Sequence, residues 1–322
     1  MKVSFNSKFK ALMLVAGLAT GFAAHASSTV TFDPSGTVGP ANDVSFTTLD
    51  QRPGNALAIG ASANSAVGTR FNLVYQSNLG SVLNVNGDAV FNQGAVVGGA
   101  ARYFTFVAGF SEIITGNSIV GGNGVLTFAF DPANGNAVSA NNFFYMYATS
   151  ASGNNLAGTG FATGTPILVG HFIAQGYTST FAANTGSPVA LDQNGGNDYA
   201  GTTTITGAGS TVATLVIDSF NAAYFPNLVV GATSSLINTS QNLAFAQVDP
   251  SARFSSNGLL DGNIAGVGSV GSVNGLSGPN TVFQADANQS FNVAAVPEPL
   301  PAALIGLGLV AMGLARRRSK KD

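Results

Sequence analysis

The chain has 322 residues, 45% of them apolar, and contains neither cysteine nor tryptophan. The absence of cysteine excludes a disulfide framework, a thiolate zinc site and a cysteine nucleophile. Eight of the 12 lysines and arginines lie in the first ten or the last seven residues. Residues 27–296 hold four arginines, no lysine and twelve acids, a net charge of −8, and so few cations argue against nucleic-acid binding.

Residues 1–26 have the three parts of a secretory signal peptide. Three lysines in the first ten residues precede an apolar run, residues 11–23, which is too short to span a bilayer of about 30 Å. Ala24 and Ala26 supply the small residues of a cleavage site, so the expected mature chain begins at Ser27. We therefore expect a signal-peptide helix, export through the Sec translocon and cleavage by signal peptidase. The alternative is an uncleaved anchor.

Between the two ends of the chain, apolar residues recur at every second position. Phe104, Phe106, Ala108 and Phe110, for example, would share one face of an extended segment. Such a pattern predicts strands with one buried face, and breaks rich in Gly, Asn and Ser separate them. The predicted strands are residues 44–49, 71–79, 102–110, 125–130, 143–149, 166–175, 202–206, 212–218 and 243–248.

The spacing of these strands predicts an all-β fold, an antiparallel β-sandwich or jelly-roll-like single domain over residues 27–295. A split into two domains near residues 193–196 is possible but less favoured. Residues 261–280, the most Gly- and Ser-rich stretch, are expected to form a long loop or a loosely paired hairpin. No repeat of fixed period stands out, which argues against a solenoid.

Residues 296–322 form a second apolar and basic end. Val296, Pro297, Glu298 and Pro299 precede a 16-residue apolar segment, residues 300–315, which predicts a short hydrophobic helix. A basic cluster follows, and the positive-inside rule keeps it in the cytoplasm while the body of the chain lies outside. The arginines of this basic stop-transfer tail are Arg316, Arg317 and Arg318.

The Pro-Glu-Pro triplet, the short apolar segment and the terminal arginines, in that order, resemble the PEP-CTERM sorting signal. The resemblance implies that exosortase, a membrane transpeptidase of Gram-negative bacteria that secrete exopolysaccharide, cuts near Glu298 and Pro299. The chain would then be anchored transiently in the inner membrane before it reaches the cell surface or the extracellular matrix. The alternative is an ordinary C-terminal membrane anchor. A related tail occurs on some ice-binding proteins, so the tail alone assigns no activity.

A second resemblance covers most of residues 27–295. It is to the flocculation-associated PEP-CTERM proteins, which hold cells of floc-forming bacteria within an exopolysaccharide matrix. It implies a matrix role and names no binding residues. The segments that carry it are residues 48–58, 104–110, 142–147, 164–170 and 283–291.

Candidate catalytic residues are few. His171 is the only histidine that remains after signal cleavage, and no G-x-S-x-G elbow accompanies it, so a structural role is favoured over a catalytic triad. A glycosidase would need two carboxyl groups across a cleft. Glu112 is the one glutamate before the sorting motif, and Asp192 and Asp198 are the nearest close pair of acids. Nothing in the sequence places any two of these acids across a cleft.

The segment 192–198 is a weak calcium candidate, because oxygen ligands in a Gly-rich turn can hold calcium. Its ligands would be Asp192, Asn194, Asn197 and Asp198, but the spacing does not fit an EF-hand, and the same residues favour an ordinary turn. We expect no cofactor other than this possible calcium. The threonines of residues 202–206 resemble an ice-binding face, although Thr is also simply a good strand residue.

The sequence thus favours a secreted, non-enzymatic surface or matrix protein that exosortase processes and that contributes to exopolysaccharide-dependent floc or biofilm formation. Its expected extracellular partner is polysaccharide, since a surface rich in Asn, Thr and Ser offers many neutral hydrogen-bonding groups. The alternatives are a secreted carbohydrate-active hydrolase, a calcium-dependent glycan-binding protein and an ice-binding protein.

Overall fold

The computed structural model describes residues 29–61, 65–120, 123–154, 160–183, 189–190, 203–204, 207–240 and 280–292. All of them belong to one compact unit, Thr29–Val293. The expected signal-peptide helix in residues 1–26 and the C-terminal helix in residues 300–315 lie outside the described residues. Within the described ranges, no helix is long and apolar enough to cross a membrane.

The all-β prediction is confirmed, because the elements of the described residues are strands and two single-turn 3₁₀ helices. The 3₁₀ helices are η1 (Pro40–Asn42) and η2 (Pro132–Asn134). The strands are β1 (Val30–Phe32), β2 (Val44–Phe46), β3 (Thr48–Gln51), β4 (Gly54–Ile59), β5 (Arg70–Leu83), β6 (Ala89–Asn92), β7 (Val96–Val97), β8 (Ala100–Ala101), β9 (Tyr103–Val120), β10 (Asn123–Phe130), β11 (Phe143–Thr149), β12 (Thr165–Ala183), β13 (Val189–Ala190), β14 (Thr203–Thr204), β15 (Gly207–Phe220), β16 (Thr233–Ser240) and β17 (Asn280–Asn292).

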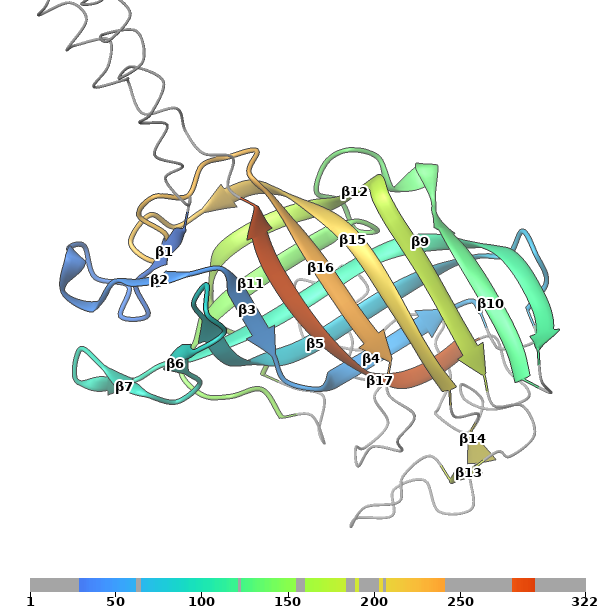
Figure 1. The fold of residues 1–322 in the computed structure, drawn as a ribbon, viewed down its shortest axis with the longest axis horizontal. Coiled ribbons are helices and arrows are strands. Elements are labelled where there is room, and N and C mark those ends of the chain that lie inside the picture. The colour runs from blue at the N-terminus through green and yellow to red at the C-terminus, as the bar shows by residue number, and fades with distance from the viewer. Residues whose placement is uncertain are drawn as a thin grey trace, which may run out of the picture. The chain divides into compact units, whose positions relative to one another are not determined.

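In the main sheet all neighbouring strands pair antiparallel, and the order of paired strands leads back to the strand at which it starts. From β9 the order passes through β11, β12, β15, β16, β17 and β3 to β5, which pairs with β9 again. Strand β4 continues from β3 end to end, so that both lie between β17 and β5, and β10 pairs with both β9 and β12. Figure 1 shows β15, β16 and β17 in a nearer layer and β5 in the layer behind them. The two layers expected of a sandwich are therefore parts of one continuous sheet.

The interior of this sheet is filled mainly by aromatic side chains. The ring of Phe32 in β1 lies at the centre of one group of these rings, with the ring centroids of Phe46, Phe91, Phe104 and Phe225 between 5.2 and 6.2 Å away. All five side chains are buried. The predicted alternation in β9 is confirmed here, since its alternate phenylalanines join this core. Aromatic burial supplies stability in a chain that has no disulfide.

A second, smaller apolar cluster lies on the opposite face of β4, β5, β9 and β11. Its members alternate with the core residues, so both faces of these strands are buried. The loop after β11 covers this cluster with the ring of Phe161. The ring packs directly on Gly153, where the Cβ of any other residue would lie 2.5 Å from it. The buried members are Leu57, Val74, Val107, Phe143, Tyr147 and Phe161.

Buried or partly buried amide side chains hold several loops to the sheet by hydrogen bonds to the backbone. Asn142 is fully buried; its Oδ1 accepts a hydrogen bond from the backbone nitrogen of Phe172 at 2.8 Å, and its Nδ2 donates to the Phe172 carbonyl at 2.9 Å. One side chain thereby satisfies both backbone groups of a residue, as a neighbouring strand would. The same two-way bond joins Asn78 to Gly153, Gln93 to Phe104 and Asn134 to Ser111.

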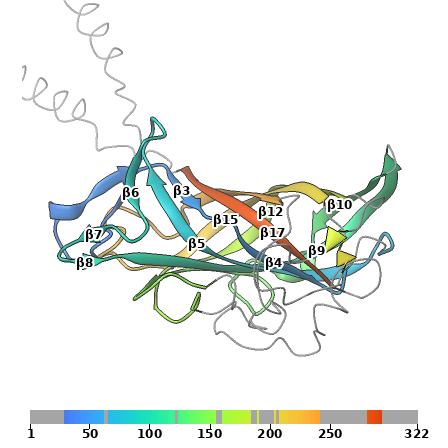
Figure 2. The same ribbon diagram turned by 90° about the horizontal axis from the view of Figure 1, so that it is seen from below.

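Figure 2 shows the same unit from below, with β7 and β8 at one end and β10 at the other. The hairpin of β1 and β2 is held to the loop after β15, since Asn227 bonds the backbone of Thr29 and Thr31. The two ends of the unit thus differ: one carries short hairpins, and the other carries the end of the long β9–β10 ribbon.

Candidate functional site

The sorting and cleavage residues cannot be placed in space, because all of them lie outside the described residues. The same holds for the calcium candidates, so both remain predictions from sequence. Among the residues that are described, no group of three or more His, Asp or Glu side chains could hold a metal ion. The residues concerned are Ala24, Ala26, Ser27, Asp192, Asn194, Asn197, Asp198, Val296, Pro297, Glu298, Pro299, Arg316, Arg317 and Arg318.

His171 lies on the outer face of β12 and pairs with Asp218 of β15. Its Nδ1 is 2.7 Å from the Asp218 Oδ2 atom. The β12–β15 ladder shifts register between Val169 and Gly170, so Asp218 stands between two paired positions. Such a bulge turns a side chain away from the regular alternation of a strand. The histidine side chain is 7% exposed, whereas the aspartate side chain is 34% exposed and available to a ligand.

Tyr145 of β11 lies near Asp218, and Tyr147 of the same strand packs against Tyr145. The rings of Tyr145 and Tyr147 stack, with centroids 5.9 Å apart and planes 22° from parallel. Tyr145 is half-buried and pairs across the sheet with Val169. Burial, together with the nearby charge of Asp218, raises the pKa of Tyr145 above its ordinary value of 10.0. An aromatic face, a phenol and a carboxylate therefore meet on one side of the sheet.

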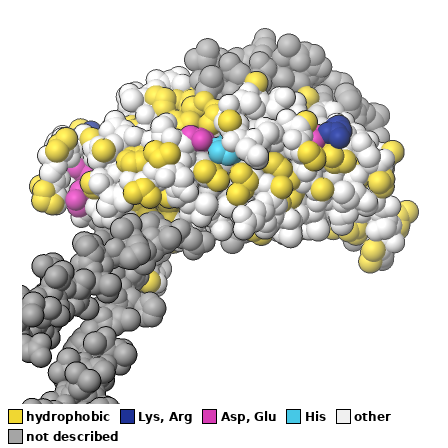
Figure 3. All heavy atoms as spheres, turned by 90° about the horizontal axis from the view of Figure 1, so that it is seen from above, with side chains coloured by type: hydrophobic (Ala, Val, Ile, Leu, Met, Phe, Trp, Pro, Cys, Tyr) yellow, Lys and Arg dark blue, Asp and Glu magenta, His cyan; other side chains and the backbone are white. Residues whose placement is uncertain are grey.

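Figure 3 shows a histidine side chain beside an acidic one on the surface, surrounded by scattered hydrophobic side chains and many neutral polar atoms. This arrangement suits a neutral polyhydroxyl ligand. Sugar rings pack their C–H faces on aromatic rings, and carboxylates accept strong hydrogen bonds from hydroxyls. We call the set Tyr145, His171 and Asp218 the tyrosine–aspartate face; Tyr147 is buried beneath the loop after β11 and supports the ring of Tyr145 from below.

His171 and Asp218 are two of the three members of a Ser-His-Asp triad. Within the described residues, no serine hydroxyl is hydrogen-bonded to His171. The pair therefore fits the structural role expected for this histidine, namely holding the Asp218 carboxylate in place across the bulge. Sequence reasoning identified His171 but missed Asp218 and Tyr145 as its neighbours.

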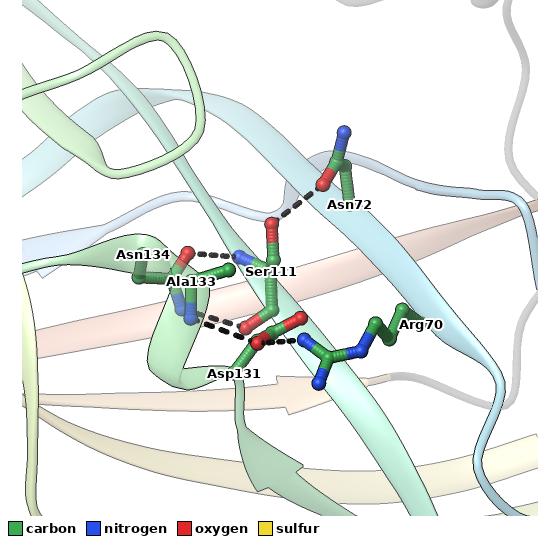
Figure 4. Close-up of polar contacts among 6 residues, drawn as sticks. All are labelled: Arg70, Asn72, Ser111, Asp131, Ala133 and Asn134. Atoms are coloured by element: carbon green, nitrogen blue, oxygen red, sulfur yellow. Dashed lines mark hydrogen bonds and ion pairs between the residues drawn. The ribbon is translucent and has the colours of Figure 1, made fainter.

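A second polar cluster, drawn in Figure 4, closes the end of β10. Arg70 forms an ion pair with Asp131, whose Oδ1 also accepts the backbone N–H of Ala133 at 2.9 Å and so caps η2. Asn134 bonds both backbone groups of Ser111. These contacts all hold one turn against β9, so we assign the cluster a structural role.

Glu112 lies inside the sheet rather than at a surface. It is 3% exposed and accepts a hydrogen bond from the hydroxyl of Tyr177. Burial raises the pKa of Glu112 to about 7, although hydrogen bonds from Tyr177 and Ser179 oppose the shift. Burial and the carboxyl group in turn raise the pKa of Tyr177. A carboxyl group enclosed in this way has no polymer within reach, so Glu112 does not fit the surface carboxylate that a glycosidase needs.

No family model, curated protein or solved structure matches the chain. The tyrosine–aspartate face therefore rests on its own geometry.

Proposed function

We propose that the protein is a secreted, non-enzymatic matrix protein that exosortase processes at its C-terminus and that contributes to exopolysaccharide-dependent floc or biofilm formation. The observation that carries the proposal is the order of signals at the chain ends. The predicted leader ends at Ala26, and the motif beginning at Val296 is followed by a short apolar segment and three arginines. Between them lies an acidic, lysine-free stretch that includes the all-β unit.

Contact with polysaccharide is assigned in this proposal to the tyrosine–aspartate face. Tyr145 offers part of its ring and a neutral hydroxyl, and Asp218 offers a partly exposed carboxylate that His171 orients. A polymer with many repeats can occupy this face on many copies of the protein at once, so modest affinity at each copy still gives strong retention.

Deletion of the gene in the producing cells tests the role. Dispersed cells with polymer of unchanged length support a structural function. Shortened or lengthened polymer would instead favour the alternative, a carbohydrate-active hydrolase, and unchanged flocs would contradict both.

Asp218→Asn is expected to weaken binding to polysaccharide from the producing cells about tenfold, because a neutral amide accepts hydrogen bonds less strongly than a carboxylate. The measurement is depletion of purified protein from solution by immobilised polymer. Asp88→Asn is the matched control, since Asp88 is an exposed acid in the turn between β5 and β6. Equal retention of the two variants by the polymer would show that the tyrosine–aspartate face does not bind polysaccharide.

A further inference from the structure

Asp218 supplies the negative charge of the tyrosine–aspartate face, and only one of its two oxygens is engaged by the protein. Its Oδ2 atom is hydrogen-bonded to Nδ1 of His171, whose side chain is 7% exposed. Among the described residues, His171 is the one hydrogen-bonding partner of this carboxylate. Because the aspartate side chain is 34% exposed, its second oxygen can accept a hydrogen bond from a ligand.

No arginine in the part of the chain that the structure describes forms an ion pair with this carboxylate. Arg70 pairs with Asp131, and the Arg102 side chain donates to the Val97 carbonyl. In Figure 3 the histidine and the acidic side chain next to it have no basic side chain beside them. Residues 27–296 carry a net charge of −8, so the field of the whole body attracts polycations and repels polyanions. The local charge and the overall charge therefore favour the same sign of ligand.

The hydroxyl of Tyr145 gives the face a second oxygen. Its ring contacts those of Phe143 and Tyr147 on the same strand, with centroids 6.2 and 5.9 Å from its own, so the ring is held in place. The hydroxyl lies close enough to Asp218 for the charge of the carboxylate to contribute to the raised pKa of the phenol. A carboxylate oxygen and a phenol oxygen thus lie near each other on a partly exposed surface.

We propose that the tyrosine–aspartate face binds the protonated amino groups of an amino-sugar polysaccharide. This inference rests on the proposed function and names the class of polymer. An ammonium group has three donors, so it can bond Asp218 and the Tyr145 hydroxyl together, whereas a sugar hydroxyl has a single donor. Charge-assisted hydrogen bonds are also about twice as strong as neutral ones. The neutral hydroxyls of the same sugars suit the rest of the face, and a polymer of uronic acids would be repelled.

Retention of the protein isolated from the producing cells on two immobilised oligomers tests the proposal. The oligomers are oligoglucosamine and the same oligoglucosamine after N-acetylation, at neutral pH, where a substantial share of the free amines is protonated. The wild type is expected to bind the amine form about tenfold more strongly, and this preference should fall with added salt. Asp218→Asn should bind both forms alike. Asp88→Asn is the matched control and should keep the wild-type preference, since it removes the same charge from an exposed turn.

Circular dichroism establishes that Asp218→Asn retains the sheet. If it does not, Tyr145→Phe takes its place, because it removes the second acceptor, keeps the ring and should lower the preference about threefold. A wild type that binds both oligomers equally, or neither of them, overturns the inference. The proposed function is judged separately, by the deletion phenotype and by binding to polymer from the producing cells.

A preference for the amine form that survives in the site variant also overturns the inference, because it would come from the charge of the whole body. Loss of the preference in Asp88→Asn as well as in Asp218→Asn has the same meaning. Loss in Asp218→Asn alone supports the assignment of the amino group to this face.

Discussion

Asn142→Asp is expected to lower the free energy of unfolding by about 3 kcal/mol at pH 7, because it leaves a buried charge and an unpaired carbonyl. Asn142 is fully buried, and its amide accepts from and donates to the backbone of Phe172. A carboxylate keeps the acceptor, loses the donor and faces the Phe172 carbonyl with a negative charge. Urea denaturation followed by circular dichroism measures the change.

The neighbouring Asn141→Asp is the control, since Asn141 is exposed and makes the same change in charge. Its stability should stay within about 0.5 kcal/mol of the wild type. The deficit of Asn142→Asp should shrink at pH 3, where a protonated carboxyl can again donate. Equal stability of the two variants at pH 7 would show that the amide does not hold the loop before β11 to β12.

Glu112 is expected to make the protein less stable as the pH rises. Its folded pKa of about 7 lies above the ordinary value of 4.5, so the neutral form is favoured in the fold. The contribution is fully present below pH 4.5 and is lost as the pH rises through 7. A shift of this size corresponds to about 3 kcal/mol. Denaturation midpoints between pH 4.5 and pH 8 measure the loss.

Glu112→Gln removes the titration while keeping an acceptor for the Tyr177 hydroxyl. Its stability should change little over this range, and above pH 7 it should exceed that of the wild type. Asp88→Asn, which removes an exposed acid, should retain the wild-type slope. A slope that survives in Glu112→Gln would assign the pH dependence to another group.

The strands that sequence predicts best are those with large alternating side chains. Residues 143–149 coincide with β11, and residues 102–110 and 125–130 fall almost entirely within β9 and β10. Length was underestimated where strands continue as exposed ribbons, as at the end of β9, because polar residues there carry no burial signal. Residues 44–49 form two strands, β2 and β3, rather than one.

Besides several short strands, three longer strands of the main sheet carry too weak a pattern to be predicted. In β17 the inner face is made partly of Ala285 and Ala287, which are small, and β16 is rich in Ser and Thr. Strand β4 lies just after Pro53 and contains alanines on its inner face. These strands complete the circle of pairings, so local alternation could not distinguish a continuous sheet from two separate ones.

The candidate site was only partly visible in the sequence. His171 and Asp218 are 47 positions apart, and a register shift in the ladder brings them together. No local pattern signals that shift. The abundance of Asn predicted surface groups for glycans, yet Asn78, Asn134 and Asn142 are buried and bond backbone. Part of the Asn content therefore serves the fold.

The intact mass of the protein isolated from the producing cells tests the central proposal most directly. Export and exosortase processing predict a chain that begins at Ser27 and ends near Pro299, with any glycosylation visible as added sugar-sized increments. A product that still carries Arg316, Arg317 and Arg318 would contradict processing at the sorting signal.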